Sequence, residues 1–348
     1  MTERVRHSFA VQAGHCERLG SPFTAMLLRL VAARLTGDTA LGRRILGWPG
    51  DPEADALPLR LAGGLHALVR RGRLPDLAAL YPPAAPDPAA LWEALARAFA
   101  TAADLDPWLD SAPQTNEVAR SGVLMPGLMA VAAMTGSKPI VLWEIGASAG
   151  LNLVLDAYAY ELGGRAAGRP GAGLHLAPDW TGPPPPEASV RIAARRGVDL
   201  NPLDVTDAQH RERLTAYVWP DQSARLARLE AALALAAADP PPLDRGDAVA
   251  WLAERLAAPP QAGRARVVQH SIALQYLPVQ GQAQVAALLS EAGARATPDT
   301  PLAWLAYEFE GGPAGLRLTL WPGGRTHRLA TAHPHGQWVR WEGLPGSR

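Results

Sequence analysis

Pro139-Ile-Val-Leu-Trp-Glu144-Ile-Gly146-Ala-Ser148-Ala-Gly150-Leu-Asn152 is the stretch that decides the fold. Residues 139–145 form a short apolar run between a proline and a glycine, which is typical of a strand buried inside a parallel sheet. Small residues at 146, 147, 148 and 150 let the backbone turn sharply and approach a ligand closely. We expect a helix directly after this turn, with its first N–H groups open to that ligand.

The pattern of the chain changes at this strand. From residue 9 to about 135, apolar residues recur at helical spacing after prolines, and no strand pattern is present. After residue 139, strand-like runs at 190–198, 265–270 and 302–307 alternate with helical runs at 208–217, 222–238, 248–257 and 283–292. This order builds a parallel sheet covered by helices. Residues 316–321 and 328–341 look like a closing antiparallel pair.

Composition excludes several classes of protein. The 33 Lys and Arg residues balance 33 Asp and Glu residues, so no bulk charge attracts nucleic acid or anionic lipid. The single cysteine, Cys16, excludes an intrachain disulfide and a cysteine-rich metal site, and we expect no metal. The N-terminus lacks the apolar core of a signal peptide, and the apolar stretch 123–145 is interrupted by prolines and Lys138. We therefore expect a cytoplasmic protein that does not enter a membrane.

The strand and its turn resemble the first motif of the class I S-adenosylmethionine-dependent methyltransferases, in which an acid precedes Gly-x-Gly-x-Gly. Glu144, Gly146 and Gly150 match that motif, while Ser148 replaces its middle glycine. The resemblance implies an α/β fold with a Rossmann-like, methyltransferase-type sheet at 136–348, preceded by a helical N-terminal domain at 1–135. It also implies S-adenosylmethionine as cofactor, an unidentified and small acceptor molecule, and cofactor contacts at residues 144–152, including Ala147 and Asn152.

Three later segments fall in the order that this family requires. Asp199, followed by Leu200, would bind the two ribose hydroxyls, a task for which a carboxylate is suited. Asp247, followed by Ala248, would lie near the adenine, although a helix N-cap is the alternative for Asp247. His270 and Ser271 end the fourth strand, at the edge where open α/β sheets bind ligands.

The spacing of these segments implies an insertion. The separation between Gly150 and Asp199 is more than twice the ~20 residues that usually divide the glycine-rich turn from the acidic residue in a compact βαβ unit. We expect the excess, which includes residues 174–186, to leave the sheet between the first and second strands of the domain.

The whole chain also resembles an uncharacterised bacterial domain-of-unknown-function family, found in actinobacteria and relatives, which implies no activity. The shared segments lie at 114–117, 144–153, 219–222 and 333–336. In the first of them, Thr115 or Asn116 would cap the next helix. The alternative is that Asn116, Glu117 and Arg120 face the cofactor or the acceptor.

The candidates for acid–base chemistry are His270, Tyr276, His333 and His335. Histidine titrates closest to neutral pH, which suits it to proton transfer. A purely structural role is the alternative for each histidine.

Two other functions remain open. Gly146-Ala-Ser148-Ala-Gly150 also matches the Gly-x-Ser-x-Gly nucleophile elbow of α/β-hydrolases, which would make the protein a serine esterase that uses Ser148. Asp247 or Asp299, and then His333 or His335, follow in the required chain order. The third alternative is a non-catalytic binding protein on the same scaffold, because a fold does not determine a function.

Overall fold

The computed structural model describes residues 2–101 and 103–344, which form two compact units. Unit 1 comprises Met1–Thr115 and Asp207–Ala227, and unit 2 comprises Asn116–Thr206 and Arg228–Arg348. Each unit therefore contains two separate stretches of chain. None of the described helices has the length and apolarity needed to cross a membrane.

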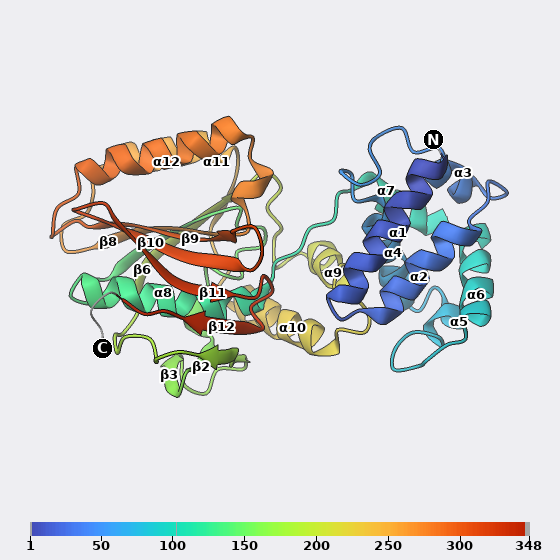
Figure 1. Cartoon of the computed structure of the whole chain (residues 1–348), viewed down its shortest axis with the longest axis horizontal. Helices are drawn as coiled ribbons and strands as arrows, with labels where there is room; N and C mark the ends of the chain where they lie inside the picture. Colours follow the sequence, from blue (N-terminus) through green and yellow to red (C-terminus); the bar gives the residue numbers. More distant parts are fainter. Residues whose placement is uncertain (1, 102, 345–348) are drawn as a thin grey trace. The chain divides into compact units, whose positions relative to one another are not determined.

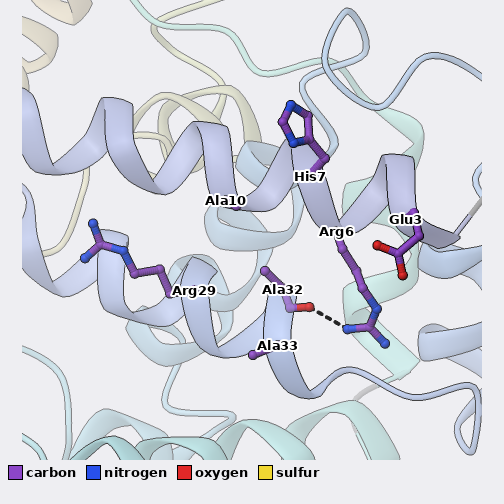
Figure 2. A pocket seen from close by; sticks show the side chains of 7 residues that line it. All are labelled: Glu3, Arg6, His7, Ala10, Arg29, Ala32 and Ala33. Atoms are coloured by element: carbon purple, nitrogen blue, oxygen red, sulfur yellow. Dashed lines mark hydrogen bonds between the residues drawn. The ribbon is translucent and has the colours of Figure 1, made fainter.

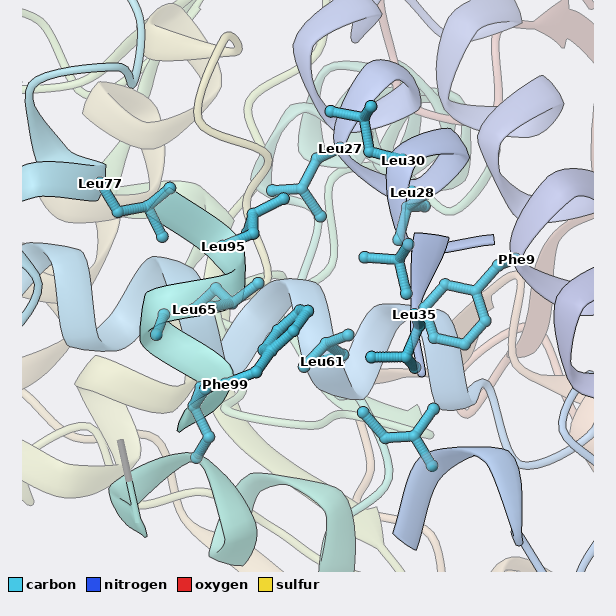
Figure 3. Close-up of a cluster of buried hydrophobic side chains, with 14 of the residues drawn as sticks. Phe9, Leu27, Leu28, Leu30, Leu35, Leu61, Leu65, Leu77, Leu95 and Phe99 are labelled. Carbon is cyan, nitrogen blue, oxygen red and sulfur yellow. The ribbon is translucent and has the colours of Figure 1, made fainter. Parts of the chain in front are cut away.

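Unit 1 is helical, as the sequence predicts for this part of the chain. A proline occupies the first or the second position of several of its helices, where a missing N–H costs nothing. The helices enclose a core rich in leucine and phenylalanine, in which Phe9, Leu61 and Leu65 are at most 1% exposed (Figure 3). The helices are α1 (Thr2–Arg18), α2 (Pro22–Arg34), α3 (Ala40–Leu46), α4 (Leu57–Arg70), α5 (Pro75–Ala78), α6 (Pro88–Thr101), η1 (Ala103–Leu105), α7 (Asp106–Asp110) and α9 (Ala208–Ala216).

Residues 207–227 complete unit 1 although they lie far away in the sequence. Asp221 accepts hydrogen bonds from the Ser21 hydroxyl and from the Phe23 amide (2.9 Å), at the start of α2. Gln222 Nε2 donates to Leu19 O at 3.1 Å. The segment at 219–222, which suggested the bacterial family, thus acts as a clamp on the start of α2.

Unit 2 contains a nine-stranded, mostly parallel sheet in the order β5-β12-β11-β10-β9-β8-β1-β6-β7. Strands β7, β6, β1, β8 and β9 are parallel, β9 to β12 form an antiparallel meander, and β5 runs parallel to β12. The bounds are β1 (Ile140–Ile145), β5 (Asp179–Thr181), β6 (Ile192–Asp199), β7 (Leu243–Arg245), β8 (Ala265–Ser271), β9 (Leu302–Phe309), β10 (Ala314–Trp321), β11 (Arg325–Ala332) and β12 (Trp338–Trp341).

The order of the parallel strands determines where a ligand would bind. Counted along the chain, the five parallel strands lie in the order third, second, first, fourth, fifth. The chain therefore moves to one side of β1 through β6 and β7, and to the other side through β8 and β9. In open α/β sheets, the carboxyl ends of the strands at such a reversal are the usual ligand site.

Helices cover both faces of this sheet (Figure 1). Helices α11 (Ala248–Ala257) and α12 (Val279–Ala294) pack on one face, and α8 (Ser121–Met134) packs on β9, β10 and β11 from the other. Helix α8 thus joins the sheet of unit 2, although it precedes residue 136. A small sheet lies beside it, made of β2 (Ala159–Leu162), β3 (Arg165–Gly168) and β4 (His175–Leu176). The remaining elements are η2 (Val118–Arg120), η3 (Leu155–Ala157), η4 (Leu274–Tyr276) and α10 (Ser223–Ala238).

The helix that we expected after the glycine-rich turn is not formed, and this prediction was wrong. The chain continues through turns to the short η3 and then into the small sheet. Gly146, Ser148 and Gly150 have positive φ values, which a right-handed helix cannot contain, so no helix can begin directly after β1. Residues 147–155 are all buried.

Candidate functional site

The turn after β1 requires glycine at two positions. Gly146 (φ 68°), Ser148 (φ 54°) and Gly150 (φ 72°) adopt the left-handed region alternately, which folds the chain tightly. A Cβ on Gly146 would lie 2.6 Å from the Ala273 Cβ, and a Cβ on Gly150 would lie 2.6 Å from the Pro241 Cγ. Of residues 146–150, only Gly146 is exposed, so a ligand would approach the turn there.

The amides of the turn already have protein acceptors. Ser148 N donates to Asp199 Oδ2 at 2.9 Å, while Ala149 N and Leu151 N both donate to Asn116 Oδ1, at 3.2 and 3.0 Å. The amides at 146 and 147 bond to a carbonyl of β6. Because residues 147–151 are buried, each N–H needs a partner within the protein. The turn therefore does not present a row of open N–H groups, contrary to the expectation from the sequence.

Asp199 lies at the turn, where the order of the segments placed it. Its Oδ1 accepts from Asn201 N at 2.9 Å, and its Oδ2 accepts from Ser148 N. The side chain is half-buried, and an ionised carboxylate has acceptor capacity for about four hydrogen bonds, so it can accept more. The neighbouring Leu200 is 67% exposed.

Asp247 is the N-cap of α11. Its Oδ1 accepts from Val249 N at 3.0 Å and from Ala250 N at 2.9 Å, and Ala248 begins the helix. Among the described residues, no hydrogen bond joins Asp247 to the turn. The helix-cap alternative therefore describes the observed contacts of Asp247.

His270 is fully buried, and both of its ring nitrogens have partners. Trp304 Nε1 donates to His270 Nε2 at 2.8 Å, so the ring proton resides on Nδ1, which faces Glu308 Oε1 at 2.6 Å. Burial opposes the ionisation of Glu308, but the hydrogen bond from His270 and those from two backbone amides hold its pKa below the ordinary value. His270 thus has a structural role in these contacts. Tyr276, by contrast, is 79% exposed.

Arg120, in η2, hydrogen-bonds two other segments at the carboxyl edge of the sheet: the turn at 333–336 and the end of β8. Its Nε donates to Pro334 O and its Nη1 donates to Ser271 O, both at 2.9 Å. Glu117 Oε1 accepts from Ala119 N at 3.2 Å and so caps η2.

The turn at 333–336 packs against the segment that contains Arg120. Gly336 lies so close to the backbone of Ala119 that a Cβ would be 2.3 Å from its carbonyl oxygen. Tyr307 donates from its hydroxyl to His333 O at 2.6 Å, and His335 N donates to His333 Nδ1 at 3.1 Å. Burial lowers the pKa of His333, against the opposing influence of Glu117. Residues 116 and 117 of the first segment that suggested the bacterial family therefore lie in unit 2 with the segments at 144–153 and 333–336.

A group of buried polar side chains, Glu144 on β1, Gln269 on β8 and Ser148 in the turn, lies at the turn after β1. Glu144 is 1% exposed, and burial raises its pKa to about 8; Gln269 and Arg120 lower it, and Asp199 raises it further. Gln269, which is fully buried, donates from Nε2 to Asn152 O at 3.1 Å. Within the described residues, Glu144 Oε2, Ser148 Oγ and Gln269 Oε1 lack a hydrogen-bond partner.

Gln269 was not predicted as a site residue, although the sequence contains a signal for it. All seven residues of β8 are buried, and a glutamine inside a buried strand must find hydrogen-bond partners there. A polar side chain in the middle of an apolar run is therefore informative.

The geometry of a nucleophile elbow is not formed around Ser148. No helix follows this serine, and its hydroxyl makes no hydrogen bond to a histidine in the part of the chain that the structure describes. Its positive φ and its position directly after strand β1 are the structural features that such an elbow would share.

Unit 1 has a groove of about 370 Å³ on α1 and α2, lined by Glu3, Arg6, His7, Ala10, Arg29, Ala32 and Ala33 (Figure 2). Its two arginines have other partners: Arg6 donates to carbonyls at the end of α2, and Arg29 pairs with Glu17. None of the residues singled out in the sequence lines this groove.

Comparison with curated proteins and with solved structures finds no match. A family model described as "Uncharacterized protein conserved in bacteria (DUF2332)" matches residues 6–341, which is nearly the whole chain. The match covers both units, including the clamp at 219–222 and the turn at 333–336. The chain therefore belongs to this bacterial family.

Proposed function

We propose that unit 2 is a Rossmann-like, S-adenosylmethionine-dependent methyltransferase that acts on a small-molecule acceptor. One observation carries the proposal: Asp199, at the end of β6, is hydrogen-bonded at 2.9 Å to Ser148 in the turn after β1. This pair lies at the carboxyl edge of the sheet, where the order of the parallel strands reverses. Such positions are the usual ligand sites of open α/β sheets.

The residues at this edge fit the ribose of a nucleoside cofactor. The half-buried Asp199 can accept further hydrogen bonds from two neighbouring hydroxyls. The exposed Gly146 has no side chain to obstruct the approach of a ligand to the backbone. Because the amides at 147–151 are engaged by the protein, recognition in this proposal depends on Asp199 and on the surface at Gly146.

The bound cofactor would supply a methyl group on a positively charged sulfur. The protein would then contribute mainly by aligning donor and acceptor, which accounts for much of the acceleration in such reactions. The negative charge of Asp199 favours a cationic cofactor at this edge.

Calorimetric titration of the full-length protein with S-adenosylmethionine and S-adenosylhomocysteine tests the proposal. Asp199→Asn keeps one acceptor oxygen for the turn but removes the charge, so we expect the affinity to fall at least roughly tenfold, which corresponds to about 1.4 kcal/mol. Asp207→Asn is the matched control, because Asp207 also accepts from two backbone amides, but in unit 1. Absence of binding, or equal affinities of the two variants, would contradict the proposal.

Two further assays separate the alternatives. Transfer of a labelled methyl group from the cofactor to small molecules of a cell extract distinguishes an enzyme from a non-catalytic binding protein. Covalent labelling of Ser148 by a fluorophosphonate would instead support the serine esterase.

A further inference from the structure

Glu144 and Gln269 lie side by side on the adjacent strands β1 and β8. They are register partners in the parallel sheet, and they are 1% and 0% exposed. Glu144 Oε2 and Gln269 Oε1 are both acceptors without a donor among the residues that the structure describes. Buried acceptors are normally satisfied, so this pair requires an explanation.

One proton satisfies both oxygen atoms. A neutral glutamic acid carries an O–H donor, and a carboxamide oxygen accepts it. The orientation of the Gln269 amide is determined independently, because its Nε2 donates to Asn152 O at 3.1 Å. That bond leaves Oε1 as the atom available to Glu144.

We propose that Glu144 and Gln269 form a proton-operated switch that anchors the end of the turn at Asn152. With Glu144 neutral, its O–H donates to Gln269 Oε1, and Gln269 Nε2 donates to Asn152 O. When Glu144 loses its proton to solvent, the carboxylate only accepts. The Gln269 amide then rotates to offer its NH2 group to Glu144, and Asn152 O loses its donor.

The groups around Glu144 determine when the proton leaves. Burial is the dominant influence and raises the pKa of Glu144, and Asp199 at the end of β6 acts in the same direction. The hydrogen bond with Gln269, which favours the ionised form once the amide offers its NH2 group, and the charge of Arg120 before α8 lower the pKa. Tyr158, after η3, also interacts with Glu144, but burial raises its own pKa and its hydroxyl donates to Leu151 O. With a pKa of about 8, Glu144 holds its proton at neutral pH and releases it in mildly alkaline solution.

The anchor connects the sheet to the turn and to α8. Besides its bond from Gln269, Asn152 accepts at Oδ1 from the Ser121 hydroxyl at 2.7 Å, at the start of α8. Loss of the donor at Asn152 O therefore loosens the segment between the turn and η3. This inference does not depend on which ligand the turn binds.

Hydrogen–deuterium exchange of the full-length protein, followed by mass spectrometry between pH 6 and 9, tests the switch. After correction for the intrinsic exchange rate, we expect protection of residues 150–158 to fall roughly fivefold as Glu144 ionises, the factor that one net hydrogen bond gives. In Glu144→Gln, the new NH2 group donates to Gln269 Oε1 as the neutral acid does, so protection should stay high at every pH. Glu161→Gln, an exposed residue on β2, is the matched control and should behave as the wild type.

A second variant distinguishes the switch from a general effect of pH. Gln269→Met removes both the acceptor and the donor, so protection of residues 150–158 should be low and independent of pH. Constant protection in the wild-type protein, or an unchanged pH dependence in Glu144→Gln, would overturn the inference.

Discussion

Replacement of Glu144 by glutamine should abolish most of the pH dependence of the stability of unit 2 between pH 5 and 8. The side chain is 1% exposed, and burial favours its neutral form. In the unfolded chain, the same carboxyl ionises freely. Glutamine resembles the neutral acid in both states, so the variant has no proton to lose on unfolding.

The sign and size of the effect follow from the pKa. In the folded protein the pKa is about 8, against 4.5 ordinarily, so the folded state binds the proton more tightly. The free energy of unfolding is therefore highest below pH 4.5, falls as the pH rises through this window, and levels off above about 8. At about 1.4 kcal/mol for each pH unit, the whole window amounts to roughly 5 kcal/mol, of which about half is lost between pH 5 and 7.

Urea unfolding of both proteins at pH 5, 6, 7 and 8 measures this effect, with exchange protection of β1 and β8 as the signal for unit 2. The difference between the two proteins cancels the contribution of all other titrating groups. Glu144→Gln should be roughly 3 kcal/mol more stable than the wild type at pH 7 and equally stable near pH 4.5. A difference that stays constant from pH 5 to 8 would show that Glu144 is already ionised in the folded protein.

Three further substitutions test other parts of the structure. The pKa of Asp244 is about 2, lowered first by its hydrogen bonds from Arg196, so this carboxylate contributes stability above pH 3.8 that is lost as the pH falls through 2. Asp244→Asn should cost roughly 1–3 kcal/mol in urea unfolding at pH 7 and much less at pH 2. Gly146→Ala combines a positive φ with a Cβ only 2.6 Å from the Ala273 Cβ and should cost roughly 2–5 kcal/mol, whereas Gly164→Ala, with a positive φ but open space, should cost only about 1–2 kcal/mol; equal losses would refute the packing of the turn. Asp221→Ala should destabilise unit 1 by roughly 1–3 kcal/mol, because it removes the clamp on α2, and a thermal unfolding curve identical to that of the wild type would contradict this role.

Helices and strands could be predicted where apolar periodicity and prolines within the segment itself determine the secondary structure. The apolar run at 265–270 corresponds to β8 (Ala265–Ser271), and the expected helix at 248–257 coincides with α11. Prolines marked the beginnings of α2 and α6. In each case, the residues that decide the element lie within it, so neighbouring positions suffice to recognise it.

Long-range pairings could not be predicted in this way. Strand β5 has three residues and pairs with β12, which lies more than 150 residues further along the chain. The return of residues 207–227 to unit 1 includes the contact between Asp221 and the start of α2, some 200 residues apart in the sequence. Neither contact leaves a periodic pattern in the sequence.

The candidate site was predicted in part. The order of the segments placed Asp199 at the turn, and the shared segment at 114–117 pointed to Asn116. That Asn116 is the acceptor for two amides of the turn could not be predicted from its residue type. Asp247 illustrates the opposite case, because one aspartate can either cap a helix or bind a ligand, and its contacts are those of a cap. Gln269 was overlooked because the strand pattern treats it as one more buried position.

The missing helix after the turn explains why the site differs from the simple expectation. At a helix N-terminus, the first N–H groups have no partners and can meet a ligand. Here the segment is buried and non-helical, so the amides of the turn must be satisfied by Asn116, Asp199 and the β6 backbone instead. A ligand that takes these amides would have to displace Asn116 or Asp199, whereas a ligand that binds the spare acceptor capacity of Asp199 displaces nothing. The second arrangement costs less, and for this reason the Asp199→Asn variant, rather than a change in the turn itself, is the sharper test of ligand binding at this edge.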